Sequence, residues 1–196
     1  MSAKICIEGG GNDAFTLRIC KSAFVQYCEK VVRPLRMPRI VASGSRDEAY
    51  RDFITSLSDR RYDLVSLLVD SEDPVQTTSA IDHLRNRDRW QLPQTSAQQI
   101  FLMTQCMESW FLADKDTLEQ YYGQGFLRNS LPARTNVEAI PKAEVMNSLE
   151  HASAPCQKKK YHKTNHGFAI LALINPTLVE AASQHARLFN DFLRGL

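Results

Sequence analysis

Lys4-Ile-Cys-Ile-Glu8 is a short apolar run that ends on a carboxylate and leads directly into Gly9-Gly-Gly11. A second apolar run, Leu64-Val-Ser-Leu-Leu-Val69, ends in the same way on Asp70-Ser-Glu-Asp73. Short apolar runs with β-branched members are typical of buried strands in a parallel sheet. Because parallel strands end at one edge of their sheet, where open α/β sheets bind ligands, we expect these acids to lie close together.

The segment between the two runs predicts a βαβαβ unit. Apolar residues recur at three- and four-residue steps after Asp13, which indicates a helix through about Val32. Arg39-Ile-Val-Ala42 predicts a second strand, and Arg46 to Leu57 predicts a second helix. Strands that alternate with helices in this way predict an α/β fold, in which helices cover a mostly parallel sheet.

The second half of the chain predicts mainly helices. The expected elements are a helix over Ala80 to Arg89, a fourth strand over Gln99 to Met103, a helical turn over Met107 to Asp114, a helix over Lys115 to Tyr122, a helix near Pro141 to His151, and two helical pieces from Phe168 onward. We therefore expect one domain over residues 1–196, with an α/β core over 1–110 and a mainly helical addition over 111–196.

Composition limits the classes of protein that this chain can belong to. The five cysteines are odd in number and include no Cys-x-x-Cys pair, which favours a reduced, cytoplasmic protein over a disulfide-linked one. Neither a signal-peptide hydrophobic region nor an apolar stretch of about 20 residues is present, so we expect a soluble protein with no membrane contact. The net charge of +2 is too small to indicate nucleic-acid binding, so any such contact must come from a local basic patch.

Glu8, Asp70 and Glu72 form the strongest candidate site. Asp70 and Glu72 are two residues apart on an extended segment, so their side chains point the same way. Crowded carboxylates repel one another unless a cation lies among them, and oxygen ligands suit Mg²⁺ or Mn²⁺. Asp73 is an alternative to Glu72 as a ligand. The competing interpretation is that these acids face solvent or cap a helix.

The basic stretch from Lys158 to Lys163 is the candidate nucleic-acid contact. Lys158, Lys159 and Lys160 could hold a phosphate backbone, Tyr161 and His162 could stack on bases, and Lys163 could stabilise charge in a transition state. Many such runs are only solvated loops, which is the alternative here.

Three further residues are candidates for an additional site. Asn12 and Asp13 follow the glycines. Glu108 lies in a mixed segment beside Trp110, where a carboxylate that faced the core would need a metal or a partner such as an arginine. The alternative is that Glu108 is a solvated acid on the face of a helix.

A rival hypothesis is a dinucleotide site. Gly9-x-Gly11-x-x-Ala14, with Ser43 and Arg46 placed for a 2′-phosphate, fits an NADP-binding fingerprint. The crowded acids would repel a pyrophosphate, which disfavours this alternative.

The blocks ending in Glu8 and in Asp70-Ser-Glu72 resemble the Toprim domain of topoisomerases, primases and OLD-type nucleases. That family has a Glu after its first strand and an Asp-x-Asp after its third, and its nucleases bind divalent metal there. The resemblance implies a three-layer Toprim-like fold and a metal-dependent nuclease acting on DNA or RNA. This chain departs from the pattern because Glu72 replaces the second Asp.

A narrower resemblance covers most of the chain. The segments Ile7 to Gly11, Met37 to Val41, Leu68 to Asp73, Met107 to Asp114 and Ala139 to Ala143 are similar to an uncharacterised bacterial family, whose genes commonly lie beside OLD-like or ABC-type ATPases in apparent phage-defence loci. The resemblance implies an effector that works with such an ATPase. A non-catalytic partner of the ATPase is the alternative.

Overall fold

The centre of the computed structural model is a four-stranded parallel sheet. The structure describes residues 2–11, 13–32, 37–76 and 79–196. Its strands are β1 (Ala3–Ile7), β2 (Arg39–Ala42), β3 (Leu64–Asp70) and β4 (Ile100–Met103), in the order β2-β1-β3-β4. All neighbouring strands are parallel, so all four end at the same edge. The predicted α/β class is confirmed, and the architecture is consistent with a Toprim-like fold.

Helices cover both faces of the sheet because side chains alternate along each strand. Ile5, Ile7 and Leu68 pack in a core with α1 (Ala14–Glu29) and α8 (Gln184–Gly195). Cys6, Leu67 and Val69 point to the other face, into a second core with α2 (Arg46–Ser56) and α3 (Ala80–Asp88). Both sides of the strands are therefore buried, which explains why they are nearly continuous apolar runs.

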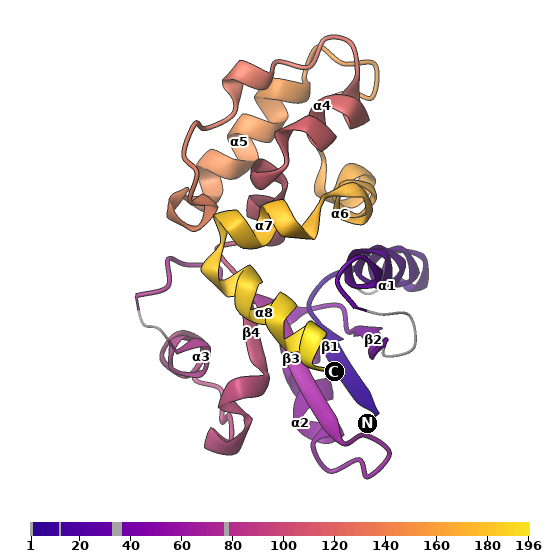
Figure 1. Ribbon diagram of the computed structural model, residues 1–196, viewed down its shortest axis with the longest axis vertical. Coiled ribbons are helices and arrows are strands. Elements are labelled where there is room, and N and C mark those ends of the chain that lie inside the picture. Colours follow the sequence, from indigo (N-terminus) through magenta and orange to yellow (C-terminus); the bar gives the residue numbers. More distant parts are fainter. Residues whose placement is uncertain (1, 12, 33–36, 77–78) are drawn as a thin grey trace.

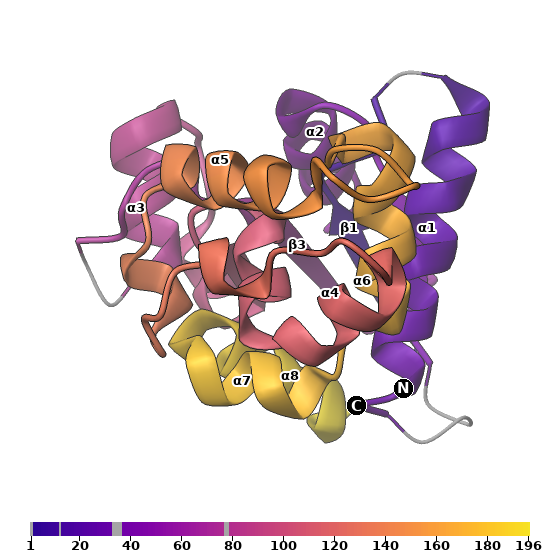
Figure 2. The same cartoon turned by 90° about the horizontal axis from the view of Figure 1, so that it is seen from above.

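The remaining helices gather beyond the carboxyl ends of the strands. They are α4 (Lys115–Tyr122), α5 (Lys142–Ser153), α6 (Phe168–Leu173) and α7 (Pro176–Ala182), with short 3₁₀ turns at Met107–Ala113, Arg128–Ser130 and Val137–Ala139 and a π turn at Lys163–Gly167; the 3₁₀ turn Gln94–Gln99 leads into β4 and is not part of this group. Figure 1 places this group above the sheet, and Figure 2 shows it in front of β1 and β3. The helical half therefore covers the edge where the acids lie.

Three helices, not two, follow the π turn. Asn175 caps α7 and Pro176 occupies its first turn, while Ser183 caps α8 by accepting a hydrogen bond from the Ala186 backbone. These caps break the chain twice, so the expectation of two helical pieces was wrong. No helix in the described ranges is long and apolar enough to cross a membrane.

Candidate metal centre

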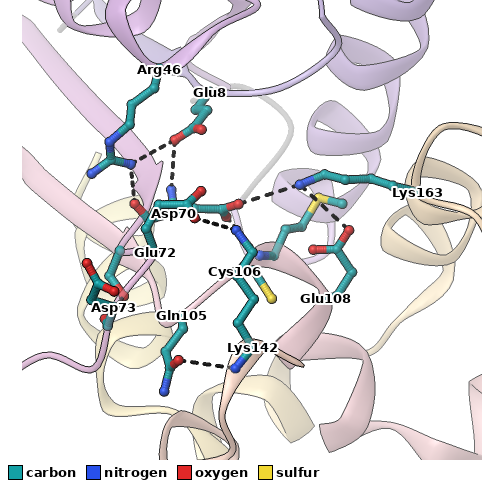
Figure 3. Close-up of polar contacts among 12 residues, drawn as sticks. Glu8, Arg46, Asp70, Glu72, Asp73, Gln105, Cys106, Glu108, Lys142 and Lys163 are labelled. Carbon is teal, nitrogen blue, oxygen red and sulfur yellow. Dashed lines mark hydrogen bonds and ion pairs between the residues drawn. The ribbon is translucent and has the colours of Figure 1, made fainter. Parts of the chain in front are cut away.

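The acids after β1 and β3 meet at the carboxyl edge of the sheet. The backbone N–H of Asp70 donates to Glu8 Oε2 at 3.1 Å, although the two residues are 62 positions apart. One carboxylate oxygen from each of Glu8, Asp70 and Glu72 lies within 4.8 Å of the others, as Figure 3 illustrates. The predicted convergence of these three side chains is confirmed.

A sharp turn after β3 brings Glu72 back toward the other two acids. The N–H of Ser71 still continues the sheet by donating to Met103 O at 3.0 Å. Glu72 then adopts a left-handed backbone with φ of 64°, and its N–H donates to Gln105 O at 2.8 Å. A left-handed non-glycine residue is strained and persists only where its surroundings hold it, which is common at functional sites.

The glycine turn forms one wall of a cavity beside the acids. Gly9, Gly10 and Gly11 line this cavity of about 200 Å³ together with Glu8, Gly44, Asp70, Met103, Met107, Lys163 and Phe168. Gly10 has a φ of 92°, and a Cβ there would lie 3.0 Å from the Leu17 Cα. The turn therefore requires glycine, and its bare backbone leaves space next to Asp70.

Each of the three acids faces a cation. Arg46 lies 3.0 Å from Glu8 Oε2, Lys163 lies 3.6 Å from Asp70 Oδ2, and Lys142 pairs with Glu72 Oε2. Asp88 holds the guanidinium of Arg46 by two bonds of 2.9 and 2.8 Å. Arg46 is thus fixed, whereas the two lysines have flexible stems that can move aside.

Backbone donors orient the carboxylates, as outer-shell groups orient metal ligands. Asp70 Oδ1 accepts the Met107 N–H at 2.8 Å, at the start of the 3₁₀ turn Met107–Ala113. Glu8 Oε2 accepts the Asp70 N–H. These bonds set the direction in which Asp70 Oδ2 points, toward Lys163 and the cavity.

The electrostatic state of the site follows from its burial. Burial raises the pKa of Asp70 to about 7, although Lys163 opposes the rise, and the charges of Glu8 and Glu108 add to it. Burial also raises the pKa of Glu8, against the effect of Arg46. Burial alone would lower the pKa of Lys163, but Asp70 and Glu108 outweigh it, so the pKa is raised and the ammonium stays charged. The raised pKa values of Asp70 and Glu8 mean that these two buried carboxyls bind a proton more readily than they would in water, and a divalent cation would compete with that proton.

Glu108 lies next to this cluster and is fully buried. Its Oε1 accepts a 2.9 Å hydrogen bond from the Tyr161 hydroxyl and lies 3.7 Å from Lys163 Nζ. Its partners are therefore the buried Tyr161 and the partly exposed Lys163, not the arginine considered as an alternative. Glu108 is not among the three acids that converge.

Two predicted acids lie away from the cluster. Asp73 is exposed and pairs with Arg87 at 2.8 Å, so Glu72 and not Asp73 joins Glu8 and Asp70. Asp13 is exposed and caps α1 by accepting the Thr16 N–H at 2.9 Å. Asn12 lies outside the described residues.

The basic stretch contributes one residue to the cavity, Lys163. Lys160 pairs with Glu150 at 2.8 Å, and Lys158 lies over the Tyr121 ring at 5.1 Å. Lys159 and His162 are exposed. Tyr161 is 1% exposed, because its ring packs against Phe111 and its hydroxyl binds Glu108, so its predicted role of stacking on a base was wrong.

Sequence reasoning missed two cations of the site. Arg46 was considered only for a 2′-phosphate, although its position at the start of the helix after β2 already placed it at the carboxyl edge of the sheet. Lys142 lies 70 residues from Glu72 and has no local signal that indicates this contact.

Fold and site together define an α/β protein with an acidic cluster at the carboxyl edge of a parallel sheet. The chain belongs to the family described as Domain of unknown function (DUF4276), whose model matches residues 7–196. The match includes every acid of the cluster and Lys163. Neither the search of curated proteins nor that of solved structures found a match. The predicted uncharacterised family is confirmed, and its relation to Toprim domains stays a prediction.

Proposed function

We propose that this protein is a divalent-metal-dependent nuclease that hydrolyses phosphodiester bonds in DNA or RNA. The observation that carries the proposal is the convergence of Glu8, Asp70 and Glu72 within 4.8 Å beside a cavity that Lys163 also lines. Paired carboxylates with an adjacent cation are the groups that metal-assisted phosphoryl chemistry requires.

The donor atoms fit Mg²⁺ or Mn²⁺. All three are carboxylate oxygens, which such hard cations prefer, and none is a thiolate or an imidazole. Glu8, Asp70 and Glu72 would hold the cation, with Lys142 and Lys163 moving off their carboxylates. A bound divalent cation would polarise the phosphodiester and lower the pKa of an attacking water.

Lys163 and the glycine turn would act on the substrate. The ammonium of Lys163 stays charged and reaches the cavity, where it would offset negative charge that develops on the phosphate. The turn at Gly9, Gly10 and Gly11 lets a phosphate approach the backbone closely. Lys159 and His162 are exposed and would contact the rest of the nucleic-acid strand.

A partner ATPase of the OLD or ABC type, and a role in anti-phage defence, are further parts of the proposal that rest on the family resemblance. The competing function is a non-catalytic partner of that ATPase. One observation favours it, namely that each of the three acids already has a cationic partner. The NADP alternative loses support, because Glu8 and Asp88 both hold the Arg46 guanidinium that would bind the 2′-phosphate.

The test is Mg²⁺- or Mn²⁺-dependent cleavage of single- and double-stranded DNA and RNA by the purified protein. Asp70→Asn should reduce cleavage more than about 100-fold, because losing a direct ligand costs more than losing an outer-shell partner. Asp73→Asn is the matched control, since it removes an exposed acid three residues away and should leave cleavage unchanged.

Circular dichroism spectra of both variants would check that each is folded. Undiminished cleavage by folded Asp70→Asn would remove this site from the mechanism. A wild-type protein that binds Mn²⁺ yet cleaves none of these substrates, with or without the ATPase and ATP, would favour the non-catalytic function.

A further inference from the structure

The ammonium of Lys163 is shared between two buried carboxylates. Its Nζ lies 3.6 Å from Asp70 Oδ2 and 3.7 Å from Glu108 Oε1, and Figure 3 shows it reaching between them. The side chains of Asp70 and Glu108 are 4% and 1% exposed, whereas that of Lys163 is 46% exposed. The Lys163 ammonium is therefore positioned by attraction to the two carboxylates more than by packing. Because its side chain is partly exposed, it has room to shift from one carboxylate to the other.

One of the two carboxylate oxygens of Glu108 is buried without a hydrogen-bond donor among the described residues. Its Oε1 binds the Tyr161 hydroxyl, but its Oε2 has no hydrogen-bond partner among the described residues. Burial, together with the charge of Glu108, raises the pKa of Tyr161, so the hydroxyl keeps its proton and donates. A buried carboxylate oxygen without a donor is unfavourable, so it calls for a partner such as a water, an ion or a donor that moves toward it.

A cation bound by Asp70 would disturb this arrangement. The proposed metal and the Lys163 ammonium carry like charge and would compete for Asp70 Oδ2. Glu108 is the second carboxylate within reach of Lys163, and its free Oε2 can accept the displaced ammonium.

We infer that Glu108 is a positioning residue that takes Lys163 from Asp70 when a divalent cation binds, and that it thereby keeps the lysine at the edge of the site. This inference rests on the proposed metal site. It differs from the simpler view that Glu108 is a fourth ligand, because Glu108 would act on the metal only through Lys163.

The test is a double-mutant cycle on the Mn²⁺ dissociation constant, measured by titration calorimetry and by the electron paramagnetic resonance signal of free Mn²⁺. The proteins are the wild type, E108Q, K163M and E108Q/K163M. E108Q should weaken Mn²⁺ binding about tenfold or more, since the ammonium then stays on Asp70. K163M should bind Mn²⁺ more tightly than the wild type, and adding E108Q to K163M should change the dissociation constant less than about twofold.

Matched controls come from the neighbouring pair Lys160 and Glu150, which lies on the same basic stretch. K160M and E150Q make the same charge changes outside the cavity and should leave Mn²⁺ affinity unchanged. If E108Q alone does not fold, comparing K163M with E108Q/K163M still decides the question. Loss of a direct ligand would weaken Mn²⁺ binding in E108Q/K163M about tenfold or more, whereas loss of a residue that acts through Lys163 would change it less than about twofold.

The outcomes separate this inference from the proposed function. Equal weakening by E108Q in both backgrounds overturns the inference and makes Glu108 a direct ligand. An unchanged affinity in E108Q, or weaker binding in K163M, also overturns it while leaving the metal site intact. A wild-type protein that binds no Mn²⁺ removes the metal site and this inference together.

Discussion

At Asp70, three kinds of neighbour act on one carboxylate. A backbone N–H from Met107 fixes one oxygen, the Lys163 ammonium faces the other, and Glu8 and Glu72 crowd it with negative charge. Burial raises the pKa of this carboxyl to about 7. The position of Asp70 at the end of β3 was predictable from its apolar run, but the pKa depends on neighbours that only the folded chain supplies.

Gly10 lines the cavity with a φ of 92°, a backbone conformation that favours glycine. Gly10→Ala should lower the free energy of unfolding by more than about 1–2 kcal/mol, because it adds a strained left-handed backbone and a contact with Leu17 Cα at 3.0 Å. Gly11→Ala is the matched control: its φ is 57°, but a Cβ there meets no atom of the described residues within 4 Å, so it should cost less. Urea unfolding of both variants measures the difference, and equal losses would contradict the role of the close contact.

At the scale of elements, α8 closes one face of the sheet and depends on its N-terminal cap. Glu138, in the 3₁₀ turn Val137–Ala139, accepts hydrogen bonds from Ser183 Oγ at 2.6 Å and from the His185 N–H at 2.8 Å. A carboxylate at a helix N-terminus also interacts favourably with the helix dipole. Glu138 therefore links the N-terminus of α8 to a 3₁₀ turn that lies 45 residues earlier in the sequence.

This cap predicts a pH dependence of stability. Burial would raise the pKa of Glu138, but its bonds with His185 and Ser183 outweigh this effect and lower it. A lowered folded pKa stabilises the protein above the unfolded value of about 4.3, and this contribution is lost as the pH falls through the folded pKa. Glu138→Gln should therefore cost about 1.5–3 kcal/mol at pH 7 and progressively less below about pH 4.3.

Thermal unfolding of wild type and variant from pH 7 to pH 3 measures that change. Glu144→Gln is the control, because its side chain is exposed and, within the described part of the chain, makes a single 3.6 Å ion pair, with Arg134. A difference between wild type and Glu138→Gln that stays constant across the whole pH range would rule out this account of the cap.

At the scale of the whole molecule, ion pairs join the helical half to the sheet edge. Lys142 from α5 reaches Glu72, and Lys163 from the π turn reaches Asp70. The site thus combines acids from the α/β part of the chain with cations from the helical half. The 3₁₀ turn that starts at Met107 joins the same edge through Asp70.

A divalent cation should therefore stabilise the folded protein. A ligand that binds only the folded state adds about 2.7 kcal/mol at a concentration 100 times its dissociation constant. Mn²⁺ should raise the melting temperature of the wild type and of Asp73→Asn, but not that of Asp70→Asn, and EDTA should reverse the rise. Differential scanning fluorimetry measures these shifts, and an equal shift in Asp70→Asn would place the bound cation elsewhere.

The sequence by itself determined three parallel strands and the meeting of Glu8 with Asp70, whereas the place of β4 beside β3 came from the structure. Apolar runs at strand length and the βαβαβ order indicate parallel strands, whose ends must share one edge. Only the tertiary structure decided that Glu72 and not Asp73 turns toward the site, that Tyr161 is buried, and that Arg46, Lys142 and Lys163 each face an acid. The physical reason is the separation of the interacting residues along the sequence. Strand and helix patterns depend on neighbouring residues, whereas burial and ion pairing depend on residues that are distant in sequence and become adjacent only after folding.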